Sequence, residues 1–117
     1  MEKTEILEVL KKVFDPEYPL SVVELKIVEE KDISFDGDKI RIEFTPTTPY
    51  CPMGGIIGVL IKHALENKFN REFDVKVKAG AHVQEAMLNE LLSSKEKYDE
   101  TIQRLKTASI LERCIKA

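Results

Sequence analysis

Residues 45–52, with the sequence Thr-Pro-Thr-Thr-Pro-Tyr-Cys-Pro, constrain the fold of this chain more than any other segment. Three prolines within eight positions remove backbone donors and fix φ, so this run cannot form a helix or the interior of a sheet. It also separates two different periodicities, because a two-residue alternation precedes it and a helical spacing follows it. We therefore predict a stiff, shaped loop that connects a strand to a helix.

Apolar and polar residues alternate over residues 33–35 and 40–44, on either side of Asp36-Gly37. Such alternation is typical of strands that have one buried face, and Asp-Gly between two of them is a strong hairpin signal. The same alternation returns over residues 73–79 and stops at a glycine. We predict a β-hairpin followed, after a crossover helix, by a third strand.

Helical spacing of apolar residues occurs over residues 4–14, over about 53–69, and through the C-terminal third of the chain. The first helix is expected to end before Pro16, because a residue that precedes proline is pushed out of the helical region. Ser94 and Ser109 are of the residue type that caps helix N-termini. The C-terminal third is therefore predicted to be several short helices.

Residues 19–25 indicate a turn followed by a short irregular or helical segment, after which Ile27 and Val28 are predicted to open a strand. No internal repeat or linker interrupts the order of elements, and 117 residues fit one domain with one core. We predict a single compact α+β domain over residues 1–117. It should have a small, about three-stranded sheet that contains the hairpin and is packed by helices.

Charge and hydropathy exclude several classes of protein. A net charge of -3 lacks the basic footprint that nucleic acid requires, and the longest apolar stretch, residues 54–61, is far shorter than a membrane span. The first residues include acids where an export signal would be basic, and two cysteines in such a chain are better interpreted as thiols than as a disulfide. We expect a cytoplasmic protein that binds neither nucleic acid nor membranes.

Cys51 is the residue that most strongly suggests chemistry. It precedes Pro52, and because proline favours the first position of a helix, Cys51 is expected near the N-cap of the helix at 53–69. A helix N-terminus stabilises an anion, so a thiolate at this position has a lowered pKa and becomes reactive or able to bind a metal. The alternative is a small buried side chain that fills the junction between strand and helix, and position alone leaves both open.

Four other polar residues are candidates for a site around Cys51. His82 and Glu85 follow the third strand and open a helix, where small domains often assemble sites, although an N-capping histidine and a solvated acid fit the same positions. Asp15 fits a helix stop with a turn. Thr45 either bonds the loop backbone or presents its hydroxyl beside Cys51.

His63 and Cys114 are given no functional role. His63 lies on the polar face of its predicted helix and should be a solvated side chain. Cys114 shares the apolar side of the last helix and should be a packed thiol.

The ligand set argues against a private, permanent cofactor. Cys51 and His82 are the candidate metal ligands, but with Glu85 they lack zinc-finger spacing, and one loop cysteine cannot supply the usual four cluster thiolates. A homodimer that joins two copies of Cys51, or a partner protein, can complete the set for a transient cluster or iron. No phosphate loop, paired-metal motif or nucleophile elbow is present, so we expect a protein that is not an enzyme.

Four motifs occur in a characteristic order: Asp15-Pro16-Glu17, residues 22–25, residues 44–53 and residues 80–85. Together they resemble the MIP-eighteen family, formerly the domain of unknown function fifty-nine. That family includes eukaryotic cytosolic iron-sulfur targeting subunits, bacterial SufT-like proteins and a subunit of phenylacetate ring-oxygenating complexes. The resemblance covers essentially the whole chain and is most specific over residues 44–53.

The resemblance implies a small α+β domain that assists the maturation of iron-sulfur proteins. It implies that Cys51 is the functional thiol or transient cluster ligand, and that Asp15, Thr45 and Glu85 occupy other motif positions. Residues 80–85 are closer to the eukaryotic-type members, whereas Cys51 followed by proline is similar to the bacterial pattern.

Two positions depart from the eukaryotic-type pattern. Tyr50 stands where those members carry a histidine, and Ala81 replaces a threonine. The resemblance therefore transfers no ligand or hydrogen bond to Tyr50 or Ala81, while it retains Cys51, His82 and Glu85.

The leading hypothesis is an assembly or targeting factor whose partners are iron-sulfur apoproteins and the proteins that assemble or carry clusters. The alternative is a non-catalytic adaptor, including a subunit of a phenylacetate-type oxygenase complex, in which Cys51 is structural. Thiol reactivity separates the two, because a packed Cys51 should resist alkylation in the folded protein.

Overall fold

The computed structural model describes residues 2–15, 20–37, 39–46 and 54–115. The helices within these ranges are α1 (Lys3–Leu10), α2 (Gly54–Phe69), α3 (Glu85–Ser93), α4 (Lys95–Thr107) and α5 (Ile110–Cys114), together with the 3-10 helix η1 (Glu30–Asp32). The strands are β1 (Ile33–Asp36), β2 (Lys39–Phe44) and β3 (Asp74–Val77). The order and types of elements confirm the predicted α+β class.

The three strands form one mixed sheet in the order β1-β2-β3. β1 and β2 are antiparallel, with Ile33 opposite Ile42, and Gly37 takes a φ of +61° in the turn between them. β2 and β3 are parallel, with Ile42 opposite Val75. Parallel neighbours require a crossover, and α2 supplies it, so the predicted hairpin and crossover are both confirmed.

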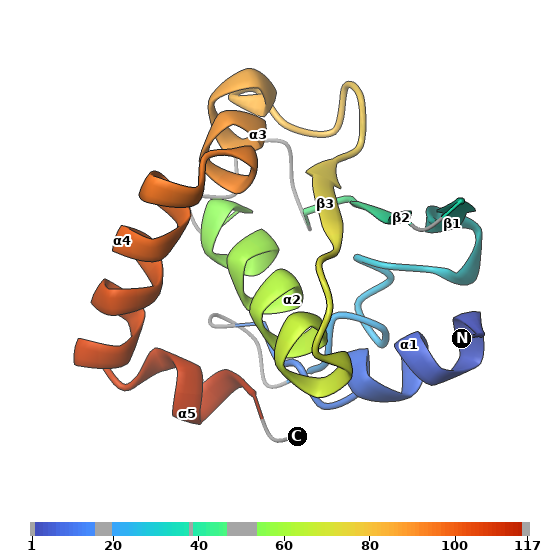
Figure 1. The fold of residues 1–117 in the computed structure, drawn as a ribbon, viewed down its shortest axis with the longest axis horizontal. Coiled ribbons are helices and arrows are strands. Elements are labelled where there is room, and N and C mark those ends of the chain that lie inside the picture. The colour runs from blue at the N-terminus through green and yellow to red at the C-terminus, as the bar shows by residue number, and fades with distance from the viewer. Residues whose placement is uncertain (1, 16–19, 38, 47–53, 116–117) are drawn as a thin grey trace.

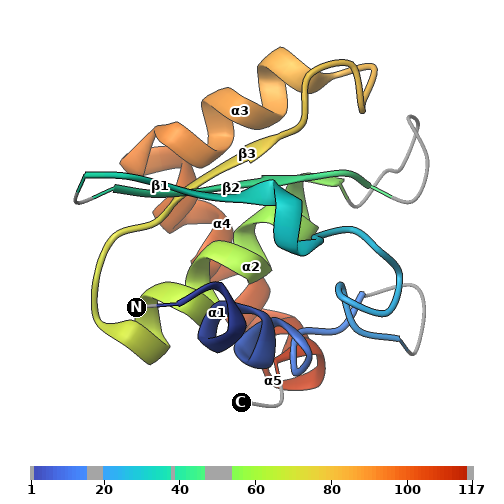
Figure 2. The ribbon, with the colours of Figure 1, turned by 90° about the vertical axis from the view of Figure 1, so that its right-hand side faces the viewer.

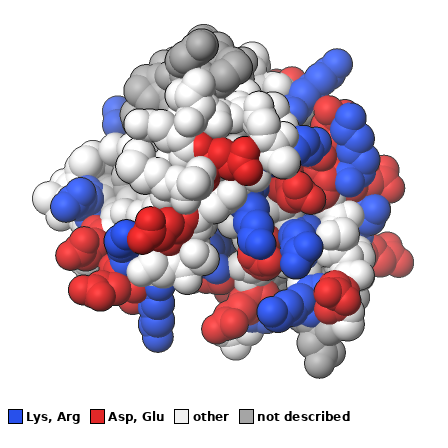
Figure 3. Space-filling model, turned by 90° about the horizontal axis from the view of Figure 1, so that it is seen from above, with Lys and Arg blue, Asp and Glu red and all other residues white. Residues whose placement is uncertain are grey.

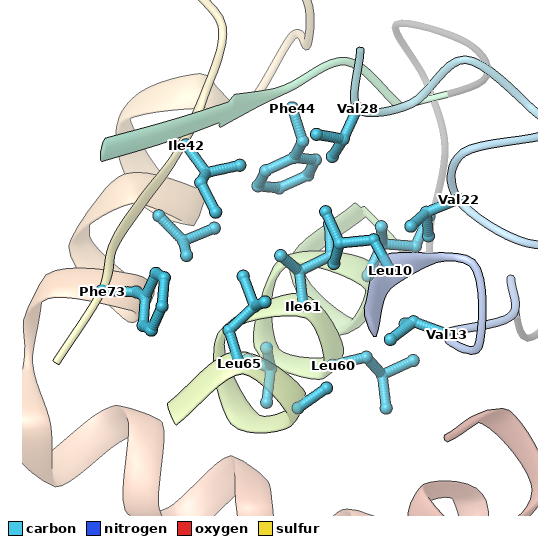
Figure 4. Close-up of a cluster of buried hydrophobic side chains, with 14 of the residues drawn as sticks. Leu10, Val13, Val22, Val28, Ile42, Phe44, Leu60, Ile61, Leu65 and Phe73 are labelled. Atoms are coloured by element: carbon cyan, nitrogen blue, oxygen red, sulfur yellow. The ribbon is translucent and has the colours of Figure 1, made fainter. Parts of the chain in front are cut away.

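One face of the sheet is buried beneath α2. Ile40, Ile42 and Phe44 of β2 are buried, whereas Lys39 and Arg41 between them are exposed. In Figure 1, α2 lies between the sheet and α4. Figure 4 shows the apolar side chains that fill the space between these layers: Leu10, Val13, Val22, Val28, Ile42, Phe44, Leu60, Ile61, Leu65 and Phe73.

α2 comes unusually close to the end of β2 at Gly58. A Cβ atom at this position would lie 2.8 Å from ring carbons Cε1 and Cζ of Phe44 and 2.9 Å from Cδ1 of Leu92. Glycine is therefore the residue that lets α2, β2 and α3 meet without a steric clash.

α3 runs along the outer edge of β3. The side-chain oxygen Oδ1 of Asn89 accepts a hydrogen bond from the backbone N–H of Val77 at 2.8 Å. This contact blocks an edge that would otherwise be open to pairing with another strand.

The C-terminal residues return to the end of α1. Val13 forms an isolated antiparallel bridge with Ile115, and the N–H of Phe14 donates to the carbonyl oxygen of Cys114 at 2.6 Å. Cys114 itself is only 4% exposed, so its predicted packing is confirmed.

Two predictions near the N-terminus are corrected. α1 ends at Leu10 rather than at residue 14, because Val13 and Phe14 pair instead with Ile115 and with Ser21. These partners are distant or beyond a turn, so local periodicity could not reveal them. The strand expected at Ile27 and Val28 is absent from the described residues, where these side chains are buried in bends that lead into η1.

The two predicted helix caps have different outcomes. The hydroxyl of Ser94 accepts from the N–H of Lys97 at 3.4 Å and caps α4 as expected. Ser109 precedes α5 but has a φ of 60° and makes no side-chain cap. On β1, Phe35 is 44% exposed although the alternation predicted a buried side, because it lies next to the hairpin turn.

Within the described ranges, no helix is both long and apolar enough to cross a membrane.

Candidate functional site

Three predicted site residues, Thr45, His82 and Glu85, follow strands that end on the same side of the sheet. β2 and β3 are parallel, so Thr45 and Lys78 follow them at one edge, and the N–H of Lys78 donates to the carbonyl oxygen of Phe44 at 2.9 Å. The N–H of Thr45 donates in turn to the carbonyl oxygen of Ile27 at 2.9 Å. Figure 2 shows the end of β2 and the loop after β3 on the same side of the molecule.

Cys51 belongs to residues 47–53, which lie outside the described residues, so its predicted role stays a prediction. The described chain on either side is well fixed. Pro46 is buried after Thr45, and at the other end an added Cβ on Gly55 would lie 3.1 Å from Leu88 and 3.2 Å from Leu91. The start of α2 at Gly55 therefore adjoins α3.

That loop, residues 78–84, is closed by hydrogen bonds of its own. Gly80 has a φ of +79°, and its N–H donates to Oε1 of Glu85 at 2.7 Å. The N–H of Ala81 donates to the carbonyl oxygen of Lys78 at 3.0 Å, and that of Glu85 donates to the carbonyl oxygen of His82 at 3.2 Å. The predicted site residue Glu85 thus has a structural task, which is to close the 78–84 loop.

His82 is buried, with 7% of its surface exposed, and its ring is oriented by the backbone. The N–H of Gln84 donates to Nδ1 of His82 at 3.0 Å, so Nδ1 must offer a lone pair. A neutral ring in this arrangement has its proton on Nε2, which makes Nε2 a hydrogen-bond donor.

This arrangement favours His82 as a donor over His82 as a metal ligand. Metal binding through Nε2 would move the ring proton to Nδ1, where it would face the N–H of Gln84. An Nε2–H donor suits an anionic neighbour such as a thiolate or sulfide. The predicted metal role of His82 stays a prediction.

Asp15 lies on a second loop connected to the same region. It is 4% exposed, and its N–H donates to the carbonyl oxygen of Leu20 at 3.0 Å, while residues 16–19 between them lie outside the described residues. The N–H of Val22 donates to the carbonyl oxygen of Val13, and that of Ile27 donates to Val22, both at 2.9 Å. Together with the bond from Thr45 to Ile27, these bonds link the region around Asp15 to the end of β2.

Sequence reasoning missed an ion pair at this end of the sheet. The ammonium of Lys78 contacts Oδ1 of Asp32, whose side chain is only 3% exposed. Forty-six positions separate the two residues, so no local pattern indicated the contact.

His63 is also less exposed than the solvated side chain that the sequence predicted. It is partly buried in α2, and its Nε2 is 2.9 Å from Nδ2 of Asn67. Burial chiefly, and the nearby charge of Lys106 next, lower the pKa of His63, while Glu66 raises it.

The described residues contain no group of three or more His, Cys, Asp or Glu side chains that could hold a metal ion. Any such site would need ligands from outside the described residues or from another chain.

Two apolar side chains are exposed beside the 78–84 loop. Val83 is 60% exposed at the tip of the loop and Met87 is 55% exposed on α3. Figure 3 looks onto this end of the molecule and shows uncharged atoms over one part of it, with Lys, Arg, Asp and Glu over the rest.

Comparison with a solved structure defines the class of fold. A crystal structure of a domain of unknown function DUF59 from Bacillus anthracis superposes with a TM-score of 0.60 at 24% identity, covering 85% of this chain and 90% of that one. The small α+β domain of this chain therefore has the fold of that DUF59 domain.

The sequence comparisons give the family. A family model described as iron-sulfur cluster assembly protein matches residues 3–79. A MIP18 family protein of Schizosaccharomyces pombe is 36% identical over 95% of this chain and 66% of its own length. The MIP18 family protein galla-2 of Drosophila melanogaster is 32% identical over 99% of this chain and 77% of its own length.

Cytosolic iron-sulfur assembly component 2B of Mus musculus is 30% identical over 100% of this chain and 74% of its own length. The chain thus spans 66% to 77% of the length of these three relatives. It belongs to the iron-sulfur cluster assembly protein family that contains the MIP18 proteins, and the resemblance seen in its motifs is confirmed.

Proposed function

We propose that this chain is a non-catalytic factor of iron-sulfur cluster assembly that carries iron or a cluster transiently to recipient apoproteins in the cytoplasm. The observation that carries the proposal is the family match over residues 3–79, which contains Cys51. Relatives named as cytosolic iron-sulfur assembly components support the same process and compartment.

Cys51 is the thiol that we assign to the cargo. The chain has two cysteines, and the other, Cys114, is 4% exposed in the core. Cys51 is three positions before Gly54, where α2 begins, and the amides at a helix N-terminus favour a thiolate over a thiol. A thiolate is the form that binds iron.

A single Cys51 cannot hold a cluster alone, because clusters usually take four protein ligands. We infer that the remaining ligands come from a second copy of the chain, from an assembly or carrier protein, or from the recipient. Such incomplete ligation suits delivery, since recipient thiolates can replace the ligands of the carrier without any change in oxidation state.

The described residues then have supporting roles. The Nε2–H of His82 stabilises negative charge on the Cys51 thiolate or on cluster sulfide. Glu85 and Gly80 hold the loop that orients His82, while Thr45 and Asp15 belong to the two connections bordering the site. The exposed Val83 and Met87 provide apolar contact area at the same end.

Anaerobic reconstitution with iron and sulfide tests this assignment. Wild type, Cys51→Ala and the matched control Cys114→Ala should be followed by visible absorption, iron content and native mass. We expect cluster absorption and bound iron in wild type and Cys114→Ala, but neither in Cys51→Ala. Iron bound per dimer would support a shared site.

The adaptor alternative gives a different pattern. If neither wild type nor Cys51→Ala binds iron, and Cys51 in the folded protein resists alkylation, the thiol is structural and the chain acts through surface contacts alone. In cells, unchanged maturation of iron-sulfur proteins after Cys51→Ala replacement would lead to the same conclusion.

A further inference from the structure

Asp32 is a buried carboxylate whose two oxygens are both engaged. Its side chain is 3% exposed, Oδ1 pairs with the ammonium of Lys78, and Oδ2 accepts from the N–H of Glu29 at 2.9 Å. The bond to Glu29 is half of a capping box that shapes η1 immediately before β1. The Asp32 side chain is therefore held in one position, immediately before β1, by its contacts with Lys78 and Glu29.

Lys78 connects three parts of the site. Its N–H bonds to Phe44 at the end of β2, its carbonyl oxygen accepts from Ala81 inside the 78–84 loop, and its ammonium reaches Asp32. The sheet register places Lys78 and Asp32 on opposite sides of β2. Phe44 of β2 lies opposite Val77 of β3, which precedes Lys78, and Ile42 of β2 lies opposite Ile33 of β1, which follows Asp32. The ion pair thus spans the last residues of β2 from one side to the other.

The 78–84 loop rests on this pair at its base. Four amides, referred to below as the loop amides, donate hydrogen bonds that define its shape: those of Gly80, Ala81 and Gln84 within the loop and that of Glu85 at the start of α3. Those internal bonds fix His82 relative to the loop, but they do not fix the loop relative to β2. The backbone bond from Lys78 to Phe44 and the Asp32–Lys78 pair hold the start of the loop against β2, while its other end continues into α3, which is anchored to β3 by Asn89.

We propose that the Asp32–Lys78 ion pair positions the 78–84 loop, and His82 within it, against the end of β2, and so supports the role in cluster binding that we proposed for His82. The functional half of this inference rests on the proposed role of Cys51. Asp32 and Lys78 are positioning residues, because they act through the loop and not on the cargo.

Amide hydrogen exchange of the loop tests the positioning directly. The Lys78→Met variant keeps an aliphatic side chain, lacks the ammonium group and leaves the Asp32 carboxylate without its counter-charge. We expect the four loop amides to exchange about tenfold faster or more, while the amides of α2 change only as global stability requires. Lys78→Arg keeps the charge and should retain slow exchange.

Lys76→Met is the matched control. Lys76 lies on β3, two positions before Lys78, is likewise partly buried, and forms no ion pair with any described residue. Its replacement should leave exchange of the loop unchanged. Equal exchange rates in Lys76→Met and Lys78→Met would overturn the proposal.

The double variant Asp32→Asn/Lys78→Met separates positioning from global stability. It leaves no unpaired buried charge, so it should recover stability even if Lys78→Met folds poorly. We expect its loop amides still to exchange fast. If loop protection instead returns to the wild-type level with stability, the pair is only a stabilising contact and the proposal fails.

Cluster acquisition then distinguishes this inference from the proposed function. In a protein that binds a cluster at Cys51, the double variant should acquire it several-fold more slowly than Lys76→Met. If wild type binds no cluster, the proposed function fails while the exchange data still decide the positioning role. If the loop loosens and acquisition stays unchanged, the functional half is refuted.

Discussion

Gly58→Ala should destabilise the protein although alanine is the better helix former. Alanine at a helix interior position gains about 1 kcal/mol over glycine, and the side chain would otherwise be harmless in α2. Here, however, its Cβ would lie 2.8 Å from two ring carbons of Phe44 and 2.9 Å from Leu92 Cδ1. Carbon atoms pack best about 3.5–4.0 Å apart, so three contacts overlap strongly.

Neither neighbour of this new methyl group can move away easily. Phe44 is fully buried and belongs to β2, and Leu92 is 4% exposed on α3. Overpacking of this kind typically costs about 1–3 kcal/mol, and the rigid ring places Gly58→Ala at the upper end of that range. After subtracting the gain in helix propensity, we expect a net loss of about 1–2 kcal/mol.

Urea and thermal unfolding measure this loss. For a domain of this size, the melting temperature should fall by about 4–8 °C. Gly55→Ala is the matched control, because its Cβ would meet only the flexible ends of Leu88 and Leu91 at 3.1 and 3.2 Å. We expect the control to stay within about 0.5 kcal/mol of wild type.

A double-mutant cycle identifies the cause. Phe44→Leu removes the ring carbons that the new methyl group meets, so Gly58→Ala with Phe44→Leu should lose less stability than the two single losses added together. Strict additivity, or a Gly58→Ala protein as stable as wild type, would show that the close approach of α2 to β2 is not as described.

Three further measurements test other parts of the structure. Burial and Lys106 lower the pKa of His63, so the unfolded chain binds a proton at this histidine more readily than the folded protein does. The free energy of unfolding should therefore decrease as the pH falls below the ordinary histidine pKa of about 6.5. NMR titration should give His63 a pKa below that value, and the Lys106→Met variant should raise this pKa. Tyr98→Phe should be neutral or stabilising by up to about 1 kcal/mol in urea unfolding, because the buried hydroxyl has no hydrogen-bond partner among the described residues. Ser94→Ala should cost about 0.5–1 kcal/mol through loss of its cap on α4, whereas Ser109→Ala, where no cap is formed, should change thermal stability by less than about 0.5 kcal/mol.

Local periodicity was sufficient to predict the elements that bury one face. The hairpin around Asp36-Gly37, the crossover helix and the third strand follow from alternation, turn chemistry and helical spacing, and each is confirmed. These signals succeed because a residue and its sequence neighbours decide which face is apolar.

Contacts between distant segments could not be predicted in the same way. The end of α1 is decided by pairing of Val13 with Ile115, and the base of the 78–84 loop depends on Asp32 and Lys78. Both contacts depend on backbone or charged groups that meet only in the folded chain. The sequence therefore predicted the residue types of the candidate site but not its geometry.

His82 illustrates the difference between residue type and role. The sequence predicted a candidate ligand or cap, but only the hydrogen bond from Gln84 to Nδ1 identifies which ring nitrogen has the proton. The role of Cys51 stays a prediction, since it lies outside the described residues.

The return of the C-terminal residues to α1 has a consequence for synthesis on the ribosome. Phe14 is made early, yet its partner Cys114 and the Ile115 that pairs with Val13 are made about a hundred residues later. At roughly 5–20 residues per second, Val13 and Phe14 are synthesised several seconds before these partners. A nascent chain in which the sheet and α2 have formed therefore still lacks the contacts of Val13 and Phe14 with the C-terminal residues. These contacts form only after the last helix has emerged.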